Sequence, residues 1–206
     1  MMENLKNEAF VVLPATAERW PDVEMLFGGH GAFAGCWCMY WRLNRTDFKQ
    51  MKGDGTKAAL RDMIYKNQTP GLLAFEKDRA VGWCSLGPRE SYAALENSRI
   101  LKRIDDQPVW SIVCFFVAKA SRRKGVLSAL LHNALRYAKE QNAIILEGYP
   151  IDITTPKLAG HKLTSPSGCM GIASVFREAG FIEVGRASET QLIMRCYLEQ
   201  NQHDDA

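Results

Sequence analysis

The first seventy residues contain one strand pattern, two helix patterns and a segment that has neither. Residues 9–13 form an apolar run closed by a proline, which predicts a strand. Over residues 17–27, apolar side chains recur at helical spacing, with a proline in the first turn, where its missing N–H is tolerated. A second apolar stripe predicts a helix over residues 56–66. Between the helices, glycines and an aromatic, cysteine-rich segment at 36–42 predict irregular structure.

From residue 71 onward the pattern changes to strands and one long helix. Residues 71–76 and 80–86 are apolar runs separated by three polar residues, which predicts a hairpin. Residues 109–117 are almost continuously apolar, as expected of a central strand covered on both faces. A leucine and alanine stripe over residues 125–141 predicts a long amphipathic helix.

The last third of the chain returns to short elements. A long loop is predicted at 151–167, and further elements at 143–146 (strand), 171–178 (helix), 181–186 (strand) and 191–197 (strand). A polar tail, residues 198–206, follows them. In chain order the elements read β-α-α-β-β-β-α-β-α-β-β, which predicts one mixed α/β domain over residues 1–206, built around a single sheet.

Composition narrows the class of protein. A chain of 206 residues with 47% hydrophobic and 24% charged residues is typical of a soluble globular domain. A formal net charge of +3 is too small to indicate nucleic-acid binding by itself. No apolar run approaches the roughly 20 residues that span a bilayer, and the polar N-terminus does not resemble a signal peptide, so we expect a cytoplasmic protein without membrane contact.

The six cysteines lie mostly inside apolar runs, so we interpret them as reduced thiols rather than as disulfides. Cys36 and Cys38 are close together, but no second pair follows at the spacing typical of structural zinc. We therefore expect no metal site.

Residues 121–126, Ser-Arg-Arg-Lys-Gly-Val, connect the apolar run 109–117 to the long helix. The N-terminus of a helix offers unpaired N–H groups and a partial positive charge, which attract anions. Gly125 leaves room for a phosphate, and three adjacent cations add attraction. The segment therefore predicts a pyrophosphate site, with a solvated basic turn as the alternative.

These motifs resemble the GCN5-related N-acetyltransferase (GNAT) superfamily. Arg122 and Gly125 match its coenzyme-binding signature, whereas Leu127 stands where the family usually has a small residue. Residues 145–148 are similar to a Leu-Glu-Val strand of the family, and residues 175–181 to its aromatic-to-Gly-Phe motif. The resemblance covers roughly residues 71–195, while the first seventy residues match only in element order.

The resemblance implies a mostly antiparallel, mixed central sheet flanked by helices, with a coenzyme-binding core at about 71–197 and acceptor-side elements at about 15–70. It implies acetyl-CoA as the acyl donor and an amine of a small molecule or peptide as the acceptor, joined by direct transfer in a ternary complex. A backbone N–H of Phe116 or Val117 would stabilise the oxyanion. The implied coenzyme-binding residues are Phe116, Val117, Arg122, Arg123, Lys124, Gly125, Val126, Leu127, Ser128 and Phe176.

Amine acetylation needs a base, because alkylammonium groups are mostly protonated near pH 7. Glu147, a carboxylate in an apolar strand, is the leading candidate, and a structural ion pair is its alternative. Asp105, Asp106 and Asp152 are weaker candidates in polar loops.

The departing thiolate needs an acid. The family's tyrosine is replaced by Phe176, which can only pack. Tyr149 faces the same side of an extended strand as Glu147 and is a substitute, with core packing or protonation by water as alternatives.

Trp37, Tyr40 and Trp41 are large amphipathic side chains that suit either an acceptor pocket or core packing. Two other functions stay open: a coenzyme A-binding module that senses or assembles without catalysis, and a basic protein that binds RNA. A homodimer also stays open as a partner.

Overall fold

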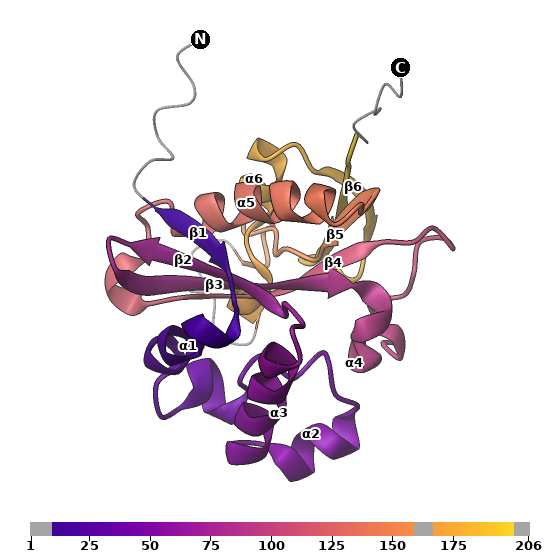
Figure 1. Ribbon diagram of the computed structural model, residues 1–206. Coiled ribbons are helices and arrows are strands. Elements are labelled where there is room, and N and C mark those ends of the chain that lie inside the picture. The colour runs from indigo at the N-terminus through magenta and orange to yellow at the C-terminus, as the bar shows by residue number, and fades with distance from the viewer. Residues whose placement is uncertain (1–9, 159–166, 200–206) are drawn as a thin grey trace, which may run out of the picture.

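The computed structural model describes residues 10–158 and 167–199, and Figure 1 shows their arrangement. Seven strands form one sheet in the order β1-β2-β3-β4-β5-β7-β6. Their bounds are β1 Val11–Pro14, β2 Gly71–Glu76, β3 Arg79–Pro88, β4 Trp110–Val117, β5 Ile145–Gly148, β6 Ile182–Arg186 and β7 Leu192–Tyr197. Every neighbouring pair is antiparallel except β4 and β5, which are parallel. The predicted mixed, mostly antiparallel sheet is confirmed.

Helices cover both faces of the sheet. Their bounds are α1 Trp20–Phe27, α2 Arg45–Met51, α3 Asp54–Tyr65, α4 Ala93–Glu96, α5 Val126–Glu140 and α6 Ala173–Glu178. In Figure 1, α5 and α6 lie on one face, and α1, α2 and α3 lie on the other. A hydrophobic core joins α5 and α6 to the sheet, and a second one joins α1 and α3 to it. Among the described residues, no helix is long and apolar enough to cross a membrane.

Two helices were not predicted. α2 buries no residue, so it lacks the apolar stripe that reveals a helix in sequence. It is set instead by its N-cap, since the Asn44 side chain accepts hydrogen bonds from the N–H groups of Thr46 and Asp47. α4 is a single turn within the polar stretch before β4. Residues 159–166 of the predicted loop and most of the polar tail lie outside the described residues.

The parallel pairing of β4 with β5 is short. It joins Trp110–Ile112 to Leu146–Gly148, and within the described residues the rest of β4 has no β5 partner. On its other side, β4 stays paired with β3 through Val117. The C-terminal half of β4 therefore has one edge whose backbone groups β5 does not cover.

Candidate functional site

The basic segment 121–126 forms the turn that leads into α5. Gly125 has φ of 91° and precedes the helix, and a Cβ built there would meet nothing within 4 Å. The N–H groups of the first turn of a helix lack helical partners. Arg123 also has a positive φ, of 63°. The turn thus presents an open glycine, exposed cations and helix N–H groups together, which fits an anionic phosphate.

Two of the three cations contact neighbouring strands, one through a hydrogen bond and one through an ion pair. Arg122 Nε donates to the Val117 carbonyl at 3.1 Å. Lys124 Nζ lies 3.3 Å from Glu76 Oε1, in an exposed pair. These contacts orient the loop against the ends of β2 and β4.

The first residues of α5 pack inward. Val126 is buried so closely against β3 that a Cβ on Gly82 would lie 2.6 Å from Val126 Cγ1. Leu127, which replaces the small residue of the family signature, packs against the core. Ser128 is half-buried, and its hydroxyl lies 3.4 Å from His132 Nδ1. A ligand at this turn would therefore meet backbone rather than the side chains of Val126 and Leu127.

The end of β4 orients its N–H groups alternately. The Ala118 N–H donates to the Val81 carbonyl on β3 at 2.9 Å. Because alternate N–H groups of a strand point to the same side, the N–H of Phe116 also points toward β3. The N–H groups of Phe115 and Val117 then point toward the edge that β5 leaves uncovered. Of the two oxyanion donors predicted from the sequence, this geometry favours Val117.

A cavity of about 380 Å³ lies on the face of β4 covered by α1 and the irregular segment before α2. This volume suits a small molecule. Aromatic side chains dominate its lining: Phe27, Phe33, Tyr40, Trp41, Phe48, Trp83, Phe115 and Phe116. Tyr40 and Trp41 of the predicted acceptor patch are among them.

Trp37, the third residue of that patch, lies elsewhere. It is 5% exposed and packs beside Trp20, with ring centroids 6.0 Å apart, and against Phe27 at 5.6 Å. Lys57 Nζ lies 5.2 Å from a Trp37 ring centroid. Trp37 does not line the cavity, which favours the packing interpretation for this residue.

Four thiols also line the cavity, and the sequence analysis assigned none of them a role: Cys36, Cys38, Cys114 and Cys169. They come from the segment before α2, from β4 and from the turn before α6. Among the described residues, no group of three or more His, Cys, Asp or Glu side chains is arranged to hold a metal ion. The spacing of Cys36 and Cys38 within an aromatic segment was the available signal in the sequence.

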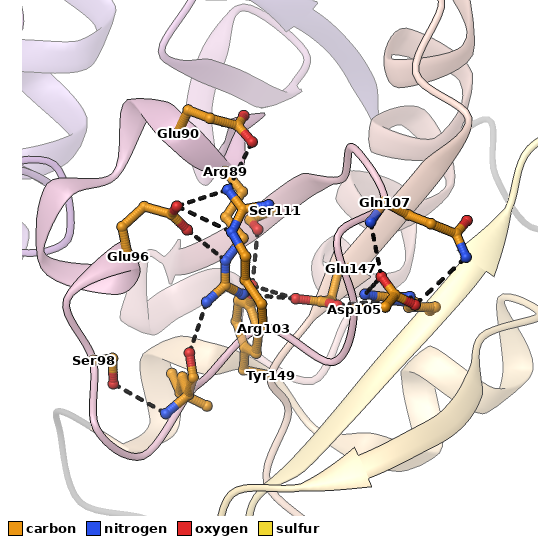
Figure 2. Close-up of polar contacts among 12 residues, drawn as sticks. Arg89, Glu90, Glu96, Ser98, Arg103, Asp105, Gln107, Ser111, Glu147 and Tyr149 are labelled. Carbon is orange, nitrogen blue, oxygen red and sulfur yellow. Dashed lines mark hydrogen bonds and ion pairs between the residues drawn. The ribbon is translucent and has the colours of Figure 1, made fainter.

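Glu147 is fully buried on β5 inside an ion-pair network, part of which Figure 2 shows. Its Oε1 accepts hydrogen bonds from Arg89 Nη1 at 2.9 Å and from the Tyr149 hydroxyl at 2.7 Å. Its Oε2 accepts from Arg195 Nε at 2.7 Å. Both oxygens therefore have partners, and Glu147 does not line the cavity. This geometry favours the structural interpretation of Glu147 over the catalytic one.

Tyr149 belongs to the same network. Its hydroxyl also accepts from Arg89 Nη1 at 2.8 Å and lies 2.8 Å from Ser111 Oγ. Burial, followed by the charge of Glu147, raises the pKa of Tyr149 well above its ordinary value. Its side chain is likewise absent from the cavity lining, which favours core packing.

The remaining carboxylate candidates lie outside the cavity lining. Asp105 forms a two-pronged pair with Arg195 at 2.6 and 3.1 Å, which lowers the pKa of Asp105. Asp152 pairs with Arg177 at 3.2 Å, and Asp106 is exposed. None of the three lines the cavity.

Phe176 is fully buried on α6. Its ring packs edge-on against Phe181 and Phe115, at centroid distances of 4.9 and 6.1 Å. It does not line the cavity, so any contact of Phe176 with a coenzyme would require a rearrangement of this core.

The sequence matches the model of a known protein family. A family model described as the acetyltransferase (GNAT) family matches residues 37–151, which is more than half of the chain. No curated protein matches the chain significantly.

Solved structures with the same fold have little sequence in common with the chain. The ribosomal-protein-S5-alanine acetyltransferase of Vibrio fischeri is 12% identical, with a TM-score of 0.53 over 93% of this chain and 94% of its own. The paia N-acetyltransferase of Thermoplasma acidophilum, in complex with coenzyme A, is 11% identical, with a TM-score of 0.51 over 91% and 98%. The protein yncA of Salmonella typhimurium, with its cofactor acetyl-CoA, is 13% identical, with a TM-score of 0.51 over 97% and 99%.

Proposed function

Because the chain belongs to the GNAT acetyltransferase family, we propose that it transfers an acetyl group from acetyl-CoA to a primary amine of a small molecule or peptide. Transfer is direct, within a ternary complex of enzyme, acetyl-CoA and amine, and residues 1–206 work as one domain. The observation that carries this proposal is the open, cationic turn at Gly125, which lies between the uncovered half of β4 and the start of α5.

In this proposal the turn binds the pyrophosphate of acetyl-CoA through helix N–H groups and the cations Arg122, Arg123 and Lys124. The thioester then lies along the edge of β4 that β5 leaves uncovered. The N–H of Val117 donates to the carbonyl oxygen as negative charge develops on it. Because β5 does not pair with the C-terminal half of β4, the gap between these two strands gives the acyl group access to the cavity on the far side of β4.

The cavity supports an acceptor amine carried on an apolar or aromatic body. Its lining is mostly aromatic, and Tyr40 and Trp41 provide large faces for stacking. Among the described lining residues, Lys52 is the only cationic side chain, and none is Asp or Glu. Further positive charges on the acceptor would thus find no carboxylate here, which disfavours polyamines as acceptors.

The test is thiol release from acetyl-CoA across amine classes: aromatic monoamines, aliphatic monoamines, polyamines and short peptides with free N-termini. We expect amine-dependent release, greatest for monoamines with an aromatic body. Release equal to the amine-free rate for every class would contradict the proposed transfer.

A second candidate is a coenzyme A-binding module without transfer activity. It is favoured by the burial of Phe176 at the place of the family's tyrosine and by the closed network around Glu147. Tight coenzyme binding by calorimetry, with no thiol release above background, would favour this candidate over the enzyme.

A further inference from the structure

The proposed transfer needs a base for the ammonium and an acid for the departing thiolate, yet no carboxylate among the described residues lines the cavity. Its ionisable groups other than Lys52 are Tyr40 and four thiols. A thiolate is a competent proton acceptor near neutral pH if its surroundings favour the charged form. The environments of the thiols therefore decide which of them can act.

Cys38 accepts a hydrogen bond from a buried indole. Trp83 Nε1 donates to Cys38 Sγ at 3.1 Å, inside the core. The Cys114 thiol and the Ser85 hydroxyl also favour the charged form of this sulfur and lower the pKa of Cys38. Since an indole N–H can only donate, this arrangement suits a sulfur that only accepts, as a thiolate does.

Arg42 places a buried positive charge near this sulfur. Its side chain is 9% exposed, and its guanidinium donates only to neutral oxygens, those of Pro70, Leu86, Ser91 and Tyr92. Its Nε has no hydrogen-bond partner within the described part of the chain, and no carboxylate there pairs with it. A buried cation without a carboxylate partner stabilises an anion nearby, and the charge of Arg42 lowers the pKa of Cys38.

The pKa values of Cys38 and Cys114 are shifted in opposite directions. The hydrogen bond from Cys114 lowers the pKa of Cys38, and its effect is larger than that of burial, which acts in the opposite direction. Hydrogen bonding of the Cys114 thiol to Cys169 and Cys38, together with burial, raises the pKa of Cys114 well above its ordinary value. The ionisable groups that face Cys38 are Cys36 beside it, Arg42, Cys84 on β3, Tyr92 and Cys114 on β4.

Cys36, the next thiol along the chain, is held in the protonated form. Burial, and then the charge of a Cys38 thiolate, raises the pKa of Cys36 to about 11. The backbone at this point is strained, because Trp37 and Cys38 have positive φ values of 44° and 58°. Residues other than glycine with a left-handed backbone conformation are common at functional sites.

We propose that the paired thiols of Cys38 and Cys114 perform the acid–base chemistry of the transfer proposed above, with Cys38 as the base and Cys114 as the acid. Two carboxylates of different environment divide these roles in many enzymes, and here two thiols do so. The proposal explains why neither Glu147 nor a tyrosine at position 176 is needed in the cavity.

The Cys38 thiolate takes one proton from the acceptor ammonium, and the neutral amine attacks the thioester carbonyl, forming the C–N bond. The nitrogen of the adduct loses its second proton to water, and the C–S bond breaks with its electron pair on the coenzyme sulfur. Cys114 gives its proton to that thiolate and recovers one from Cys38. The enzyme returns to its starting state, and one proton is released to solvent.

The first test needs no acceptor. The ultraviolet absorbance of thiolate is followed against pH in the wild type, in Cys38→Ala and in the control Cys196→Ala, whose thiol lies on β7, outside the cavity lining. We expect a thiolate signal at neutral pH that is absent only from Cys38→Ala. A Cys38 that titrates at or above the ordinary pKa of a thiol would overturn the proposal.

The second test uses an acceptor found in the amine panel. Cys38→Ala is expected to lower kcat/KM near pH 7 by roughly a hundredfold, in line with the loss of a general base. The deficit should shrink above the pKa of the amine, and for weakly basic aromatic amines that are neutral at pH 7. Cys114→Ala should be rescued by acyl donors whose leaving thiol is more acidic, and Cys196→Ala should resemble the wild type.

The outcomes separate this proposal from the one on which it rests. Transfer that survives Cys38→Ala, or a loss that is the same at every pH and with every amine, overturns the thiol roles and leaves the acyltransferase intact. Absence of transfer in the wild type removes the proposed function and with it the catalytic roles. In that case the absorbance titration still decides whether Cys38 is a thiolate.

Discussion

Replacing Glu147 with glutamine is expected to destabilise the fold rather than to remove a catalytic base. The carboxylate is fully buried and accepts from two arginines, Arg89 at 2.9 Å and Arg195 at 2.7 Å, and from Tyr149 at 2.7 Å. Glutamine removes the charge that compensates both guanidinium groups. It also replaces one accepting oxygen with an amide donor, which must face another donor at one of these contacts.

The expected cost is about 3–5 kcal/mol, the range for breaking a buried ion pair from one side. This is a large part of the roughly 5–15 kcal/mol that stabilises a typical protein. For a chain of this size it corresponds to a fall in Tm of about 6–20 °C. Urea unfolding followed by tryptophan fluorescence measures the difference.

Glu183→Gln is the matched control, because Glu183 also lies on a strand and pairs with an arginine, Arg186, at 2.7 Å, but its side chain is 34% exposed. Its loss should stay below about 1 kcal/mol, as for surface pairs. The structural role of Glu147 would be refuted if Glu147→Gln unfolded like the wild type while amine-dependent thiol release collapsed.

Three further substitutions test other parts of the structure. Gly125→Glu places a carboxylate in the proposed phosphate site and should weaken coenzyme A binding by about tenfold or more in calorimetry. Gly180→Glu is the control, because Gly180 lies in the turn after α6 and has a φ of 87°, similar to the 91° of Gly125; it should leave coenzyme A binding unchanged. Asp105→Asn should lower Tm at neutral pH but not in strong acid. The reason is that Arg195 lowers the pKa of Asp105 in the folded protein. The stability that this carboxylate adds is therefore fully present above the ordinary aspartate pKa and is lost as the pH falls through the lowered pKa of the folded state. Trp41→Ala should raise KM for the amine and leave coenzyme affinity unchanged; equal losses in both would contradict the acceptor role of the cavity.

The sequence was most informative where periodicity was regular. The apolar run that became β4 and the stripe that became α5 were both predicted, and the basic turn between them lies at the start of α5 as expected. α2 was missed because its stability rests on the Asn44 cap and not on burial. A local cap of this kind resembles an ordinary polar loop in sequence.

The candidate site was less accessible to sequence reasoning, because its features depend on contacts between distant segments. Glu147 appeared as an isolated acid in an apolar strand, and its partners Arg89 and Arg195 are 58 and 48 residues away. Likewise, Cys38 and its donor Trp83 are separated by 45 residues. Pairings across such distances follow from strand order, which residue patterns along the chain do not specify.

The most direct test of the proposed function is to quantify both products of one reaction mixture that contains acetyl-CoA and the best acceptor amine. We expect equal amounts of free coenzyme A thiol and N-acetylated amine by mass spectrometry, both strongly reduced in Gly125→Glu at subsaturating acetyl-CoA. Thiol release without acetylated amine, or unchanged formation of both products in Gly125→Glu, would contradict an acetyltransferase that binds its donor at this turn.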